Sequence, residues 1–141
     1  MNQLSDKLHQ AISVLSEEGN SLAASGQHEQ AKEKFLEALK LIPQPHTEWQ
    51  AATWLYTAIG DMHFHLKNHE RVMRCFINAV QCPDGLGNPF IHLRLGQAYF
   101  DLGNLEKAAD ELTRAYMGAG LDIFLEDSPK YLEFLESKIE I

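Results

Sequence analysis

A threefold repeat restricts the fold of this chain more than any other feature of its sequence. Each copy contains a glycine in its first helix, and small or apolar residues follow that glycine at offsets of 12, 16 and 19. Because steps of four and three keep side chains on one helix face, each copy predicts two helices joined by a turn. The glycines are Gly19, Gly60 and Gly96, and the residues at the offsets are Ala31, Phe35 and Ala38, then Val72, Phe76 and Ala79, then Ala108, Leu112 and Ala115. A unit of about 34 residues therefore occurs three times, with insertions of about 7 and 2 residues between copies.

The third copy has the clearest helix boundaries. Asn88 is a good N-cap, and Pro89 suits the first helical position, where a missing N–H costs nothing. Gly103 suits the left-handed backbone conformation that ends many helices. The sequence therefore predicts one helix from Pro89 to about residue 102 and a second from about residue 105 to 118.

This pattern resembles the tetratricopeptide repeat, a helical hairpin of about 34 residues. The resemblance covers Ile12–Gln44, Thr53–Leu86 and Pro89–Asp122. The second copy departs from the family pattern at three positions, which hold His63 for an aromatic residue, Lys67 for a turn glycine and Val72 for an alanine. The resemblance implies an all-α fold, a right-handed α-solenoid of three hairpins that forms a single domain over residues 1–141.

Segments outside the repeats predict additional helical structure. Thr47 and Gln50 have the spacing of a capping box, which predicts that the third helix begins about two turns before the second copy. Leu121–Leu125 predicts one further turn, and Ser128 is a good cap for a last helix at about residues 128–140. Because a solenoid leaves its last hairpin with an open apolar face, we expect this helix to cap the array.

The charge balance restricts the partners. The chain carries 12 basic and 20 acidic residues, a formal net charge of −8. Nucleic acids and anionic membranes attract proteins with a surplus of Lys and Arg, so neither is an expected partner. No apolar stretch approaches the roughly 20 residues of a membrane span. A basic protein partner would complement the negative charge.

The opening residues and the cysteines predict a cytoplasmic location. Met1–Asp6 has neither the basic start nor the apolar core of a signal peptide. Cys75 and Cys82 fall on one predicted helix, seven residues apart, which is roughly 10 Å and too far for a disulfide. We therefore expect two reduced cysteines in a reducing compartment.

In the family that the pattern resembles, the first helix of each hairpin lines a concave groove that binds partners. The positions carried over for partner binding are Asn20 in the first copy, Trp54, Thr57, Asp61, Phe64 and His65 in the second, and Phe90, Leu93, Gln97, Phe100 and Asp101 in the third. Independently, four of the third-copy positions follow one another at steps of three, four and three and so share one helix face, namely Phe90, Leu93, Gln97 and Phe100. Packing between neighbouring repeats is the alternative role of these aromatic residues.

Charged residues on this face predict contacts with a partner. Asp61 and Asp101 have no cation four residues away on their helices, so we expect both to be free for a partner's Lys or Arg. Arg94 lies to one side and could pair with a carboxylate of the neighbouring repeat. Some family members grip the C-terminal carboxylate of chaperones with five polar residues; the matching positions here are Ser16, Asn20, Ala58, Phe90 and Arg94, and only Asn20 and Arg94 agree. A terminal carboxylate needs several cationic donors, so we do not expect that chaperone role.

The sequence predicts no metal, cofactor or catalytic site. His65 and His69 have the spacing of a ligand pair, but a predicted turn lies between them and no further ligand completes a set. His63 occupies a core position and is expected to be a packed, hydrogen-bonded histidine. Phosphate-binding loops, nucleophile elbows and Cys-x-x-Cys motifs are all missing, so an enzyme is not expected.

Two functions from different classes remain open at this stage. The first is a non-catalytic protein–protein interaction module, an adaptor or co-chaperone that holds a peptide or helical segment of a partner in its groove. The second is an acidic inhibitor of the immunity type, which would mask a basic toxin. A chaperone of a bacterial secretion system is a third protein class of similar architecture. The sequence leaves the identity of the partner and the oligomeric state open.

Overall fold

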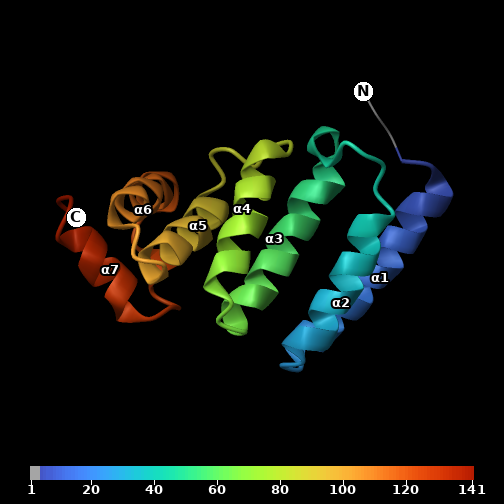
Figure 1. The fold of residues 1–141 in the computed structure, drawn as a ribbon, viewed down its shortest axis with the longest axis horizontal. Helices are drawn as coiled ribbons and strands as arrows, with labels where there is room; N and C mark the ends of the chain where they lie inside the picture. The colour runs from blue at the N-terminus through green and yellow to red at the C-terminus, as the bar shows by residue number, and fades with distance from the viewer. Residues whose placement is uncertain (1–3) are drawn as a thin grey trace.

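The structure is a computed structural model that describes residues 4–141; residues 1–3, which belong to the stretch examined above for a signal peptide, lie outside the described part. Seven α-helices and two short 3-10 helices make up the described chain (Figure 1). The α-helices are α1 (Asp6–Ala24), α2 (His28–Lys40), α3 (Gln50–His65), α4 (His69–Gln81), α5 (Pro89–Asp101), α6 (Leu105–Ala119) and α7 (Pro129–Glu136), and the 3-10 helices are η1 (His46–Glu48) and η2 (Asp122–Phe124). Over residues 4–141 no strand occurs, which confirms the all-α prediction.

The helices pair as hairpins that stack along one axis. The pairs α1/α2, α3/α4 and α5/α6 each pack together, and α2 against α3 and α4 against α5 join one hairpin to the next. Figure 1 shows the hairpins following one another from the N-terminus, with α7 at the far end. The predicted α-solenoid of three hairpins and a terminal helix is confirmed.

The repeated glycines bring the two helices of each hairpin into contact. A Cβ atom on Gly19 would lie 2.5 Å from Cε1 of Phe35, one on Gly60 2.5 Å from Cε2 of Phe76, and one on Gly96 2.7 Å from Cγ of Leu112. Real Cβ atoms do not approach other atoms so closely, so only glycine fits these sites without movement. In each hairpin the facing side chain belongs to the residue at offset 16. The sequence period therefore reports a direct helix–helix contact.

The turns inside the three hairpins share a left-handed residue, but its type differs. The first and third turns contain Gly26 and Gly103, with φ of 80° and 85°. The second turn contains Lys67 at a φ of 62°. Residues with a Cβ atom adopt this left-handed region at a cost of roughly 1–2 kcal/mol relative to glycine. The chain thus carries a lysine where the backbone favours glycine.

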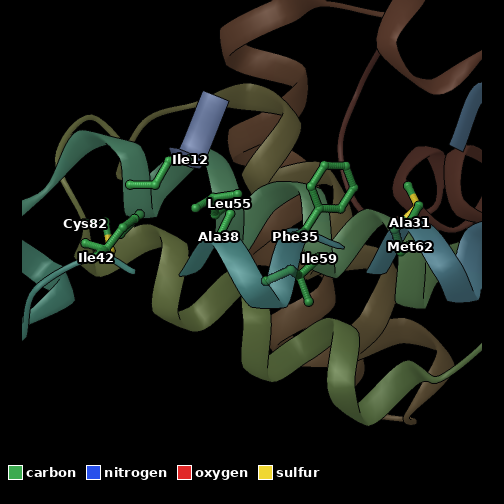
Figure 2. Close-up of a cluster of buried hydrophobic side chains, with 10 residues drawn as sticks. Ile12, Ala31, Phe35, Ala38, Ile42, Leu55, Ile59, Met62 and Cys82 are labelled. Atoms are coloured by element: carbon green, nitrogen blue, oxygen red, sulfur yellow. The ribbon is translucent and has the colours of Figure 1, made fainter. Parts of the chain in front are cut away.

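The core consists of buried clusters that follow the order of the hairpins. Figure 2 shows the first, in which Ile12 of α1, Phe35 of α2 and Leu55 of α3 lie together, with Cys82 at one end. The last cluster joins Leu112 to the terminal helix, and its buried members are Leu93, Leu112, Ala115, Phe124 and Leu135. Burial of the apolar side of α7 agrees with its predicted role as the cap. Both cysteines are free, as predicted.

Helix boundaries differ from the sequence prediction at two places. Thr47 lies within the 3-10 turn, and α3 begins at Gln50 rather than at the predicted capping box. The reason is the extended backbone of Trp49, with φ of −123° and ψ of 125°, which ends the turn and caps α3 in place of Thr47. The terminal helix α7 ends at Glu136, four residues before the predicted end. The further turn predicted after α6 is present as η2.

Candidate functional site

The predicted groove residues lie on α1, α3 and α5, and we call the side of these helices that carries them the groove face. On α3, Trp54 is 43% exposed, and its ring packs edge-on against Phe35 at 5.7 Å between centroids. Asn20 on α1 is exposed, and Thr57 is half-buried, with its hydroxyl donating to the carbonyl of Thr53 at 2.8 Å. This part of the groove face presents an aromatic side chain beside uncharged polar groups.

On α5, by contrast, residues of the groove face are buried. Leu93 is 1% exposed and Gln97 is 0% exposed, although the sequence placed both among the groove residues. Leu93 belongs to the apolar cluster that includes Phe124 and Leu135 of the C-terminal segment. The residues after α6 thus cover this stretch of α5. A partner cannot reach either side chain while that segment stays in place.

A polar network centred on Arg94 holds the C-terminal segment against α5. Arg94 Nη1 donates to Asp127 Oδ2 at 2.8 Å and to Gln97 Oε1 at 2.9 Å, and Gln97 Nε2 donates to the same Asp127 oxygen at 2.9 Å. Arg94 Nε donates to Asp61 Oδ1 of α3 at 2.9 Å. The guanidinium carbon also lies 3.8 Å from the centre of the Phe64 ring, which gives a cation–π contact.

These contacts correct one prediction and confirm another. Asp61 is not free for a partner, because Arg94 occupies one of its oxygens and His65 Nε2 lies 3.7 Å from the other. Arg94 does pair with a carboxylate of the neighbouring hairpin, as predicted. Phe64 and Phe90 both contact the guanidinium of Arg94, and Phe90 also packs against Phe76. Their aromatic rings therefore serve contacts between hairpins.

Asp101, the second carboxylate predicted to be free, is also paired. Its side chain is 5% exposed and accepts a hydrogen bond from the Tyr131 hydroxyl at 2.6 Å. Lys130 Nζ lies 2.8 Å from Oδ1, and His69 Nδ1 lies 3.3 Å from Oδ2. The prediction fails because Lys130 and His69 lie on other helices, so spacing along α5 cannot reveal them. Burial, followed by the Asp101 carboxylate, raises the pKa of Tyr131.

Phe100 is likewise drawn into packing with α7. Its ring lies 5.7 Å from that of Tyr131 and 5.0 Å from that of Phe134, measured between centroids. Phe100 remains half-buried. Phe100 and Asp101 of α5 therefore contact the chain's own C-terminal helix.

A cleft of about 560 Å³ lies where the end of α3 faces the start of α7. Four basic side chains line it, namely His65, Lys67, His69 and Lys130. The other residues of its wall are Phe64, Glu126, Asp127, Ser128 and Tyr131. Two of these wall residues, Phe64 and His65, belong to the predicted groove set. The cleft therefore adjoins the groove face at the turn between α3 and α4.

Histidines near this cleft form no metal site. His65 stacks on His28 of α2, with ring centroids 4.5 Å apart and planes 9° apart. Among residues 4–141, no group of three or more His, Cys, Asp or Glu side chains is placed to hold a metal ion. His63 is buried as predicted, with its Nδ1 3.3 Å from Asn68 Nδ2. Burial lowers the pKa of His63.

Asp127 and Lys130 were absent from the sequence-based candidates. They lie in the segment after α6, which has no repeat counterpart in the chain. No periodicity in the sequence relates Asp127 to Arg94, 33 residues away. The one local feature that the sequence offers is that Asp127 directly precedes Ser128, the predicted cap of the last helix. This feature does not identify Arg94 as its partner.

Comparisons with known proteins concern the repeat and the fold. A family model described as the tetratricopeptide repeat matches residues 91–117, which cover most of α5 and α6. No curated protein sequence matches this chain. In the part of the chain that the structure describes, no helix combines the length and apolar character that crossing a membrane requires.

Three solved structures of similar fold belong to chaperone-associated proteins or contain a bound peptide. The Hsp90 co-chaperone Cns1 from Saccharomyces cerevisiae matches with a TM-score of 0.71 and 21% identity over 94% of this chain, which spans 39% of that protein chain. The second tetratricopeptide-repeat domain of human RPAP3, in complex with an HSP70 peptide, matches with a TM-score of 0.70 and 15% identity over 92% of this chain and 96% of that one. The type III secretion chaperone SycD of Yersinia enterocolitica, in complex with a peptide of the translocator YopD, matches with a TM-score of 0.68 and 18% identity over 95% and 93% of the two chains.

Proposed function

We propose that this chain, which resembles tetratricopeptide-repeat proteins in its third repeat and in its fold, is a non-catalytic interaction module that binds a peptide or helical segment of a partner protein. The exposed ring of Trp54 carries this proposal. An aromatic anchor surrounded by polar groups is the arrangement that concentrates binding energy at protein interfaces. The similar RPAP3 domain and SycD were both solved with bound peptides, which supports the same type of ligand here.

The proposed binding surface is the open part of the groove face on α1 and α3. It comprises Asn20, Trp54, Thr57 and His65, and these side chains are exposed or half-buried. The groove residues of α5 take the supporting role, because Leu93 and Gln97 are covered by the C-terminal segment. Under this proposal the repeats are residues 12–44, 53–86 and 89–122, and about residues 128–140 form the cap.

The proposal excludes capture of a C-terminal carboxylate through Arg94. Its guanidinium already donates to Asp61, Gln97 and Asp127. A free carboxylate would have to displace Asp127 and leave that half-buried charge without its partner. This agrees with the mismatch at three of the other four positions that the family uses for such ligands, namely Ser16, Ala58 and Phe90.

Selection of peptides from a random library displayed on phage tests the proposal. Peptides that bind the natural chain should bind Trp54→Ala at least about tenfold more weakly, because truncation of an interface anchor costs more than about 1.4 kcal/mol. Met117→Ala provides the control, since Met117 is an exposed apolar residue on α6. Equal binding by Trp54→Ala, with an unchanged circular dichroism spectrum, would move the binding surface away from α3.

Two observations support more specific roles. The net charge of −8 favours an immunity-type inhibitor of a basic toxin, and the similarity to SycD favours a secretion chaperone. Affinity capture from the source cell followed by identification of the bound protein separates them. A basic nuclease supports the inhibitor, and a translocator with an apolar segment supports the chaperone.

A further inference from the structure

The cleft beside the start of α7 has a basic side chain without a partner. Lys67 lines the cleft, and its ammonium group makes no ion pair or hydrogen bond with any residue in the described range 4–141. The backbone at Lys67 has a φ of 62°, whereas glycine occupies the equivalent place in the other two turns. A lysine here costs stability relative to glycine and gains no visible contact, and an observed outlier of this kind supports a hypothesis of function.

A second ammonium group lies on the opposite wall of the cleft. Lys130 Nζ is 2.8 Å from Asp101 Oδ1. An ammonium group has three N–H donors, so two of them are left for a ligand. His65 and His69 add imidazole rings to the same cleft, and each already has a carboxylate on one of its nitrogens. The cleft thus has several donors with unused capacity.

Asp127, one of the two carboxylates that line the cleft, is occupied, and so is Asp101, which lies outside the lining and contacts Lys130. Asp127 accepts from Arg94 and Gln97, and Asp101 accepts from Tyr131 beside the Lys130 ion pair. Glu126 is the one lining carboxylate for which no partner is seen among residues 4–141. The unused groups of the cleft are therefore mainly donors, although the whole chain is acidic.

We propose that this cleft binds an anionic side chain, a carboxylate or a phosphoryl group, of the partner segment that lies along α3. The inference rests on the proposed peptide-binding function and specifies its ligand. It involves the turn between α3 and α4 and the start of α7, none of which contributes to the five carboxylate-binding positions described for the family. It also assigns a role to Lys67.

The geometry of α3 predicts the spacing of the ligand. Trp54 and His65 are 11 residues apart on one helix, which corresponds to about 16 Å at 1.5 Å per residue. An extended peptide advances about 3.3 Å per residue. The partner should therefore carry its acidic residue about five positions from the apolar residue that contacts Trp54.

Titration of the isotope-labelled chain with inorganic phosphate tests the cleft by itself. The amide signals of residues 65–69 and 126–131 should shift and saturate. Lys67→Gly should weaken this binding about tenfold, because a charge-assisted donor is lost, while the melting temperature stays equal or rises because glycine suits the turn. Lys40→Gln, at an exposed lysine of α2, should leave phosphate binding unchanged. Glu126→Gln should strengthen it about two- to fivefold.

Synthetic peptides distinguish the two anionic groups and separate this inference from the proposed function. They carry a leucine and, five positions away, glutamate, phosphoserine or glutamine. The glutamate or the phosphoserine peptide should bind more tightly than the glutamine peptide, and Lys67→Gly should abolish the difference. Non-saturating shifts with phosphate, or a Lys67→Gly variant that binds phosphate like the natural chain, would overturn the inference. If all three peptides bind with equal affinity and Trp54→Ala weakens each of them, the inference is overturned but the proposed function stands. If Trp54→Ala binds the peptides as tightly as the natural chain does, the proposed function is contradicted and the phosphate titration still tests the cleft.

Discussion

Equivalent positions in the second and third hairpins have opposite environments. Thr57 and Asp61 on α3 occupy the same repeat positions as Leu93 and Gln97 on α5, three residues before and one residue after the repeated glycine. The α3 pair is half-buried, whereas the α5 pair is fully buried. The difference arises from the chain that follows, because the segment after α6 packs on α5. A repeat position thus determines which way a side chain points but not whether a partner can reach it.

Removal of the C-terminal helix should abolish this difference and have the largest effect. Deletion of residues 128–141 removes Tyr131 and Leu135, which are 4% and 0% exposed, and uncovers the apolar cluster around Leu112. Because a solenoid needs a closed end, we expect aggregation or loss of the cooperative thermal transition. Circular dichroism melting and size-exclusion chromatography provide the measurement. Deletion of residues 140–141 alone should behave like the natural chain, and equal melting of the long deletion would contradict the capping role.

Among single substitutions where the C-terminal segment covers α5, Asp127→Ala should reduce the stability of the fold most. It leaves Arg94, with a side chain 8% exposed, without one carboxylate, and it leaves the Gln97 amide without an acceptor. We expect a loss of about 2–4 kcal/mol in the free energy of unfolding, measured by urea denaturation. Asp110→Ala is the matched control, since Asp110 pairs with Arg114 at 3.5 Å on the surface, where such a pair contributes about 1 kcal/mol or less. Equal losses for both variants would show that burial of the network adds nothing.

The repeated glycines allow a direct comparison of packing in the two regions. For Gly96→Ala, the new methyl group meets Leu112, whose backbone nitrogen lies 3.0 Å from the Cβ position, so the helix itself must move. For Gly19→Ala, the obstacle is the ring of Phe35, whose outer neighbour is the half-exposed Trp54. We expect about 1–3 kcal/mol of destabilisation at Gly96 and less at Gly19, by the same urea measurement. A larger loss of stability for Gly19→Ala than for Gly96→Ala would indicate that the first hairpin packs more rigidly than the third.

The smallest effect concerns pH and the buried His63 on α3. Burial lowers its pKa in the folded chain below the ordinary value of 6.5. The unfolded chain therefore binds a proton first, and stability is lost as the pH falls below about 6.5. His63→Phe, which restores the aromatic residue typical of the repeat, should show a smaller loss between pH 7.5 and pH 5.5. Identical pH dependence of the two chains in urea denaturation would exclude this contribution.

The fold was predictable because its determinants are periodic. Gly96 and Leu112 report the contact within a hairpin directly, and the same offsets repeat at Gly19 and Gly60. Pairing of Arg94 with a carboxylate of the neighbouring repeat was also anticipated, but Asp61 was expected to be free, so the carboxylate itself was not identified. That the C-terminal segment covers α5 could not be predicted, because Asp127 lies in a segment without a counterpart elsewhere in the chain. Lys67 was recognised as a departure from the family pattern, but its place in a cleft depends on where α7 docks.

The position of Asp127 limits how this protein can be lengthened by design. A fourth hairpin fused after α6 would need the surface that η2 and α7 now cover, so the segment from Leu121 onward would have to be replaced. The new hairpin would then face an Arg94 guanidinium that has lost one of its two carboxylates and a Gln97 amide nitrogen without an acceptor. Concatenation would succeed with a carboxylate built into the first new helix, or with both buried polar residues exchanged for apolar ones. Contacts within the hairpins repeat along the array, whereas the contacts that close its C-terminal end occur only once.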